Sequence, residues 1–154
     1  MLEQLLTSLN NWFPAPGGRH TGTFEIVSGA PRVDFLAPGQ YYRVRGSTYN
    51  DGLHQAAVPP SSSDGAPSGE SAGAHVADIG HDETFTGEVW ALAIPAAVVA
   101  LADEIAAWRE KNPETDKLAE SFGGYSYTRG GGAQAGWQAA FAARMRPYRR
   151  IYDD

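Results

Sequence analysis

The histidines and carboxylates of the chain are the side chains whose chemistry could serve a metal ion or a proton transfer. The densest group is His81, Asp82 and Glu83, which together with His54 could hold a metal that assists hydrolysis. No two histidines stand four residues apart, and the His-Glu-x-x-His motif of helix-borne zinc sites does not occur. We therefore interpret this group as solvated loop residues and keep a metal-assisted hydrolase as the weaker hypothesis. The remaining histidines are His20 and His75.

An acidic run, Asp82, Glu83 and Glu88, precedes an apolar stretch of the chain. Carboxylate oxygens suit a divalent cation, but the run lacks the Asp-x-Asp-x-Asp-Gly order of a calcium loop. An acidic sheet edge that discourages wrong strand pairing is the favoured interpretation. In a ring of subunits, such an edge could equally face a channel and repel DNA phosphates.

The motifs of phosphate binding and the residues of thiol chemistry are also missing. The glycines near Gly29 and at 130–132 match neither Gly-x-x-x-x-Gly-Lys nor Gly-x-Gly-x-x-Gly, so we interpret them as turns and hinges. Cysteine is absent, which removes thiolate nucleophiles and cysteine-based zinc sites. We expect no catalytic residue, no metal and no cofactor, and we predict that the chain is not an enzyme.

Length and charge limit the classes of protein that fit. A chain of 154 residues can bury one core of ordinary size, so we expect a single domain, residues 1–154, with appendages. The formal net charge of −6 argues against gripping phosphates as the main task, although passive contact with DNA stays possible. The N-terminus has no basic region, and the apolar stretch 89–102 is interrupted by Pro95. We therefore expect no signal peptide and no membrane contact.

The sharpest charge feature is the C-terminal end of the chain. A third of all Lys and Arg residues fall within seven positions there, interleaved with aromatic and aliphatic side chains. Arginine and aromatic residues are the types that concentrate binding energy at interfaces. We predict that this segment docks on a neighbouring chain. Its predicted docking residues are Arg144, Arg146, Tyr148, Arg149, Arg150, Ile151 and Tyr152.

The first half of the chain alternates between apolar runs and turn residues. Leucines at helical spacing predict an N-terminal helix within residues 1–13, followed by a Pro/Gly connector at 14–18. Alternating residues predict a β-subdomain at 19–95, in which Tyr42 and Val44 share one face while Arg43 and Arg45 share the other. A tight turn is expected at Asn50-Asp51-Gly52. The predicted strands are 23–27, 32–36, 40–47, 53–58 and 90–94.

The second half predicts helices and one insertion. Residues 59–73 contain no large apolar side chain, so we expect a flexible insertion within the β-subdomain. A helical part is expected at 96–146, with one helix after Pro95 and a second at 134–145 that Pro147 ends or kinks. Residues 147–154 would form a C-terminal arm. The predicted class is α+β, a small antiparallel β-sheet or barrel with two or three α-helices.

The segment between the two predicted helices resembles the head–tail connector, or adaptor, proteins of long-tailed bacteriophages. In that family, Ser-Glu-Ser-aliphatic-Gly-Asp-Tyr-Ser stands between helices. The motif residues that match here are Glu120, Ser121, Gly123, Tyr125 and Ser126. Ala119 stands where the family often has Ser, while Phe122 replaces the aliphatic residue and Gly124 replaces the Asp.

Residues 46–52 and 82–90, with the helix after Pro95, resemble phage structural proteins in which a small β-domain precedes the helices. The resemblance implies an oligomeric ring, commonly dodecameric, at the head–tail interface of the virion, assembled in the host cytoplasm. Its implied partners are further copies of the chain, the portal protein, and a tail-side connector or tail-completion protein. DNA would pass through the channel without sequence-specific binding. A tail-completion or tail-terminator ring is the alternative, and the motif between the helices favours the connector.

Overall fold

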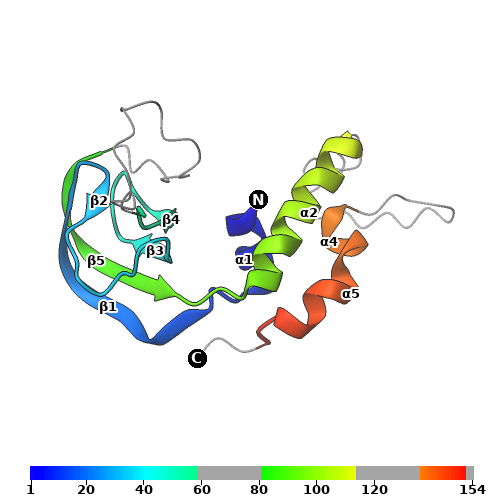
Figure 1. Cartoon of the computed structure of the whole chain (residues 1–154), viewed down its shortest axis with the longest axis horizontal. Helices are drawn as coiled ribbons and strands as arrows, with labels where there is room; N and C mark the ends of the chain where they lie inside the picture. The colour runs from blue at the N-terminus through cyan, green and yellow to red at the C-terminus, as the bar shows by residue number, and fades with distance from the viewer. Residues whose placement is uncertain (59–80, 114–135, 152–154) are drawn as a thin grey trace, which may run out of the picture. The chain divides into compact units, whose positions relative to one another are not determined.

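The computed structural model describes residues 1–58, 81–113 and 136–151. The chain forms two compact units, a helical one from Met1–Trp12 with Pro95–Asp154 and a sheet one from Phe13–Ile94 (Figure 1). The predicted α+β class is confirmed. The predicted insertion at 59–73, the connector-like motif at 120–126 and Tyr152 lie outside the described residues.

The sheet unit is a five-stranded antiparallel sheet with the strand order β2-β1-β5-β3-β4. Figure 1 shows β1 and β5 as long, curved strands that give the sheet the form of a half-barrel. The strands are β1 (Pro14–Val27), β2 (Ala30–Pro31), β3 (Tyr41–Arg45), β4 (Gly52–Gln55) and β5 (Glu83–Leu92).

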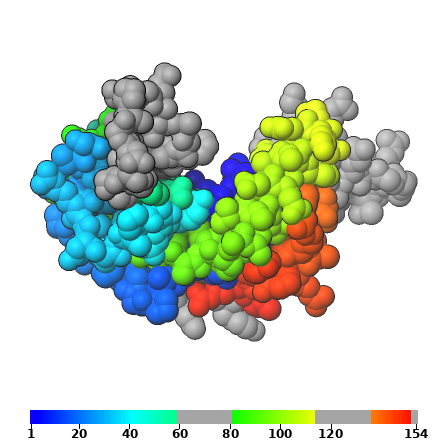
Figure 2. Space-filling view, viewed as in Figure 1, coloured from blue at the N-terminus to red at the C-terminus, as the bar shows by residue number. Residues whose placement is uncertain are grey.

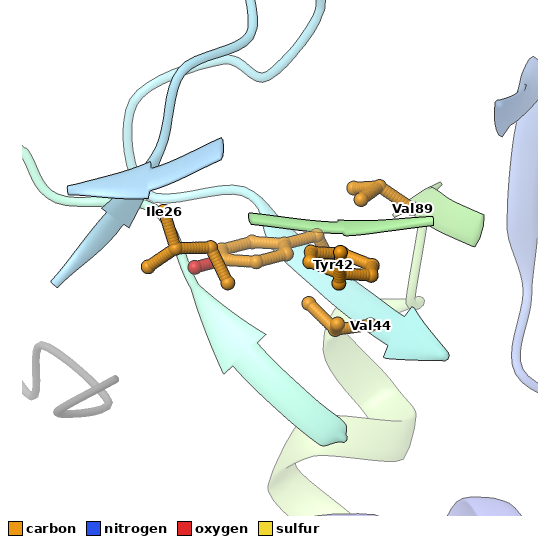
Figure 3. Packing of buried hydrophobic residues seen from close by; sticks show 5 residues of the cluster. Ile26, Tyr42, Val44 and Val89 are labelled. Carbon is orange, nitrogen blue, oxygen red and sulfur yellow. The ribbon is translucent and has the colours of Figure 1, made fainter. Parts of the chain in front are cut away.

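The core of the sheet unit lies on the inner face of the curved sheet. Alternate residues of β1, β3 and β5 point into it, as Figure 3 shows for four of them. The buried members are Ile26, Tyr42, Val44, Phe85 and Val89. Burial raises the pKa of the Tyr42 phenol, which keeps this core side chain neutral. The predicted pairing of Tyr42 and Val44 on one face is thus confirmed.

The prediction of an acidic sheet edge is wrong, because β5 begins at Glu83 and lies in the centre of the sheet, between β1 and β3. Phe85 and Val89 of β5 are buried on the inner face of the sheet, and Gly87 lies between them on the same face. Glycine and glutamate at these positions hide the apolar alternation that marks a strand. The sequence therefore predicted a strand only from residue 90 onwards.

Two further strand boundaries differ from the prediction. Residues 14–18 are no connector but the start of β1, where Pro14 pairs with Leu92 and the register shifts before Arg19. Proline is tolerated at such a strand start because its missing N–H is not needed there. Residues 32–36 form no strand, and Phe35 and Leu36 instead pack partly buried against the core.

The predicted hairpin exists with a different connection. Strands β3 and β4 pair as predicted, with Val44 opposite Gly52, but residues 46–51 join them as a six-residue loop instead of a tight turn at Asn50-Asp51-Gly52. Side-chain hydrogen bonds hold this loop, so its shape depends on contacts that are distant in sequence. Strand β4 ends at Gln55, three residues before the predicted end.

The helical unit contains two of the predicted helices. Helix α1 (Leu2–Leu9) buries Leu5, Leu6 and Leu9, and helix α2 (Ala96–Lys111) buries Val98, Leu101, Ala102 and Ile105. Both helices were predicted and are confirmed, and Trp108 near the end of α2 is half-buried. Among the described residues, none of the helices combines the length and the apolar character needed to cross a bilayer.

The predicted single helix at 134–145 is wrong as one continuous element. It consists of α4 (Trp137–Ala140) and α5 (Ala142–Met145), followed by the 3₁₀ helix η1 (Arg146–Tyr148). The break falls at Phe141, whose φ and ψ of −106° and 7° leave the helical range. Its ring meets Trp108 of α2 edge-on at 6.1 Å, a tertiary contact that local propensity does not reveal. Figure 2 shows α2 packed directly against these C-terminal helices.

Gly87 should reject a side chain, whereas Gly22, its partner on β1, should accept one. A Cβ at Gly87 would lie 2.1 Å from the carbonyl oxygen of Arg45, and a Cβ at Gly22 would meet nothing within 4 Å. We expect Gly87→Ala to lower the free energy of unfolding by about 1–3 kcal/mol. We expect Gly22→Ala to change it by less than about 1 kcal/mol. Chemical denaturation compares the two, and equal effects would contradict the close approach of β3 to β5.

Candidate functional site

The predicted docking residues fall on α5, η1 and the chain that follows. Met145 is buried and anchors this segment in the helical unit. Three side chains beyond it, Arg146, Arg149 and Ile151, are exposed, and Ile151 shows 80% of its surface. Ile151 directly follows Arg149 and Arg150 in the chain, and arginine is among the residue types enriched at protein interfaces.

The backbone of this segment is held to the end of α1. The N–H of Arg150 donates to the carbonyl of Leu9 at 3.0 Å, and the Asn11 side-chain amide donates to the carbonyl of Tyr148 at 3.0 Å. The last carbonyls of a helix lack partners within the helix, so the end of α1 offers acceptors for a passing chain. The docking segment is therefore ordered by its own chain before any partner binds.

Arg144 differs from the other predicted docking residues, because the structure pairs it within its own chain. Its guanidinium donates two hydrogen bonds to the Glu104 carboxylate of α2, and it lies 5.8 Å from the ring of Phe141. This hydrogen-bonded pair lowers the pKa of Glu104 and raises that of Arg144. Arg144 thus fixes α5 to α2 within the chain.

A groove of about 550 Å³ runs along the exposed side of the docking segment. Its lining combines the apolar side chains of Ala142, Met145 and Ile151 with two arginines. This combination suits an apolar side chain flanked by carboxylates. The residues that line the groove are Gln138, Ala142, Met145, Arg146, Arg149 and Ile151.

The carboxylates of Asp82 and Glu83 bind hydrogen-bond donors of nearby loops, and they do not form a metal site with the histidines that the structure describes. Glu83 accepts hydrogen bonds from the Ser47 hydroxyl at 2.5 Å, the Thr48 N–H at 2.8 Å and the Asn50 amide at 3.0 Å. Asp82 accepts a hydrogen bond from the N–H of Ser28 at 2.7 Å. Both carboxylates therefore hold loops of the sheet unit in place.

The histidines are spread over other contacts. His54 Nε2 lies 2.7 Å from the carbonyl oxygen of Asn50. Because a carbonyl oxygen can only accept a hydrogen bond, His54 Nε2 must be the donor and carry the proton. His81 packs against the Tyr49 ring, His20 stacks on Phe35, and His75 lies outside the described residues. In the described part of the chain, no three His, Asp or Glu side chains gather to hold a metal ion.

One serine pattern bears on hydrolase chemistry. Residues 69–73 read Gly-Glu-Ser-Ala-Gly, which fits Gly-x-Ser-x-Gly in letters. A nucleophile elbow requires this pattern between a strand and a helix, and no apolar run precedes it in the sequence. The pattern lies outside the described residues.

Sequence reasoning missed a second group of arginines, on the outer face of the sheet. Arg19 of β1 and Arg43 and Arg45 of β3 surround the Trp90 ring of β5. The alternation of β3 placed Arg43 and Arg45 on one face, which was a usable signal. The sequence does not place Arg19 beside them, because the Pro/Gly content of residues 14–18 predicts a connector and a later start for β1.

In comparisons with family models, with curated proteins and with solved structures, nothing matched the chain.

The Glu83 carboxylate should make the stability of the sheet unit depend on acid pH. Its hydrogen bond from the Ser47 hydroxyl, then that from the Thr48 N–H, holds the pKa of Glu83 below its ordinary range. A lowered folded pKa adds stability that is complete above the unfolded pKa of about 4.3 and is lost as pH falls through the folded value. We therefore expect the stability of the native protein to fall more steeply in this window than that of Glu83→Gln.

Thermal melts at about pH 7 and about pH 3 test this, with Glu3→Gln, at an exposed position of α1, as the control. Glu83→Gln should be less stable than the native protein at the higher pH and should approach it at the lower. Glu3→Gln should follow the native protein throughout. If Glu83→Gln lost as much stability as the native protein between the two pH values, the loop would not depend on an ionised carboxylate.

Proposed function

We propose that the chain is a structural subunit of a tailed bacteriophage, a head–tail connector that works in an oligomeric ring between the portal and the tail. The observation that carries this proposal is the docking segment, in which Arg146, Arg149 and Ile151 are exposed along a groove while the backbone is tied to α1. The resemblance of residues 120–126 to connector proteins agrees with it. The role is assembly, and no reaction is assigned to the chain.

The order of the segment favours docking over a solvated tail. Two backbone-directed hydrogen bonds, at Arg150 and Tyr148, already fix the path of the chain. A preordered segment loses less conformational entropy on binding than a disordered tail does. Binding energy can then come from the arginines and from the exposed Ile151.

The chemistry of the groove also describes the surface that it would meet. Arg146 and Arg149 can each form two parallel hydrogen bonds with a carboxylate, so the receiving chain should offer Asp or Glu beside an apolar side chain. The portal protein or the next copy of the chain in the ring is the proposed neighbour. Arg144 takes no part, because Glu104 of its own chain occupies it.

The double variant Arg146→Glu, Arg149→Glu tests the proposal in particles. Both side chains are exposed, so the purified variant should melt within a few degrees of the native protein. Charge reversal should make the carboxylates of a receiving surface repel the arm. We expect the variant subunit to be missing from purified virions, and DNA-filled or leaking heads without tails to accumulate, as counted by electron microscopy.

The matched control is Arg32→Glu, Lys111→Glu, which makes the same change in charge at two exposed positions outside the segment. This control should be incorporated normally. Tailed, infectious particles that contain the Arg146→Glu, Arg149→Glu subunit would overturn the docking role. Loss of tails with both double variants would point to net charge instead of this groove.

A further inference from the structure

The outer face of the sheet gathers positive charge around one aromatic ring. Arg19, Trp90 and Arg43 lie directly opposite one another on the adjacent strands β1, β5 and β3. The guanidinium carbon of Arg19 lies 4.3 Å from the centre of the Trp90 ring, and those of Arg43 and Arg45 lie 5.2 Å from it. Three cations from two different strands thus converge on a single indole.

One carboxylate balances part of this charge. Glu88 accepts a hydrogen bond from Arg45 at 3.2 Å and another from the indole N–H of Trp90 at 3.1 Å. Two exposed arginines, Arg19 and Arg45, and this glutamate together carry a formal charge of +1, in a chain whose net charge is −6. Like charges held this close repel one another, while the face of the indole attracts each of them, so the ring holds an exposed group of cations in place. Such convergence is expected where an anion is bound.

The ring itself is not available to a ligand, because Trp90 is only 8% exposed. An unpaired base therefore cannot stack on it as bases do on aromatic residues in single-strand binders. The indole instead serves as a platform that keeps the guanidinium groups in place, with Arg19 and Arg45 exposed to solvent. The accessible chemistry of this face is thus cationic donors.

The rest of the face carries hydroxyl groups and, at its far end, Glu25, which pairs with Arg32. Thr21 and Thr23 of β1 and Thr84 and Thr86 of β5 are exposed, and the Thr23 and Thr86 hydroxyls lie 3.0 Å apart. Threonine hydroxyls and arginines are the side chains that bind nucleic-acid phosphates. The exposed large apolar residues in the described part of the chain are Tyr49, Val58 and Ile151, none of them on these strands. The face therefore lacks the apolar centre that a protein interface needs.

We propose that the outer face around Trp90 binds the phosphate backbone of double-stranded DNA, through Arg19 and Arg45, without reading its sequence. This inference rests on the proposed function, in which DNA passes along a ring of these subunits. It also corrects the idea that Glu88 repels DNA, since Glu88 lies within a group that is positive overall. Each subunit contributes a weak contact, and the ring repeats it around the duplex.

The test is a titration of the full, isotope-labelled chain with a duplex of about 16 base pairs at low salt, followed by NMR. The indole N–H of Trp90 and the amides of β1, β3 and β5 should shift. Fluorescence anisotropy with the same duplex gives the affinity and its dependence on salt. Arg19→Gln should lower the affinity about five-fold and reduce the salt slope by about 0.9, as expected for one lost phosphate contact.

Lys111→Gln, which removes one exposed positive charge from α2, is the matched control and should bind DNA as the native protein does. Arg19→Gln leaves the pair of Arg45 with Glu88 intact, so the sheet should fold, and thermal melts check this. No shift at Trp90, or equal losses in Arg19→Gln and Lys111→Gln, would overturn the proposal. If polyglutamate displaced the duplex at equal charge concentration, the face would be a site for an acidic protein and the DNA proposal would fail.

The outcome separates this inference from the proposed function. A native chain that enters virions but binds no duplex refutes the DNA face and leaves the connector role standing. A chain that binds the duplex through Trp90 and its arginines but is absent from the head–tail junction refutes the connector role instead.

Discussion

Strand β5 pairs antiparallel with β1 on one side and with β3 on the other, and this pairing positions the side chains on both faces of the sheet. On the inner face it brings Phe85 and Val89 into the core, and on the outer face it sets Trp90 between arginines of two neighbouring strands. The pairing is possible because Gly87 lets the backbone of β3 approach closely. At the start of the same strand, Glu83 holds the loop that joins β3 to β4. One strand thus links the core, the loop and the charged face.

Local patterns in the sequence predicted the elements that carry a regular apolar period, namely α1, α2 and β3. They failed at β5, because Gly87 and Glu83 occupy inward positions where the period requires apolar residues. Those positions are explained only by partners far along the chain, the Arg45 carbonyl for Gly87 and the 46–51 loop for Glu83. The break at Phe141 has the same origin, a contact with a tryptophan on another helix. Tertiary contacts decided each case, and periodicity does not contain them.

The candidate sites, too, could be predicted from the sequence only in part. The density of arginines after residue 143 was visible in the sequence, and the structure shows that it has two parts. Arg144 belongs to Glu104 of its own chain, whereas Arg146 and Arg149 line an exposed groove. The group around Trp90 could not be predicted, because the register that places Arg19 opposite Trp90 depends on an irregularity in β1. We propose that both sites bind a molecule outside this chain.

A reconstruction of tailed particles by electron cryomicroscopy, at a resolution that traces the chain, tests the central claim most directly. The account predicts a ring of this chain between portal and tail, with the groove of Arg146 and Arg149 covered by a neighbouring chain that supplies carboxylates. It also predicts that the face around Trp90 points towards the DNA. A head–tail junction built entirely from other chains, or a ring in which this groove stays open to solvent, would contradict it.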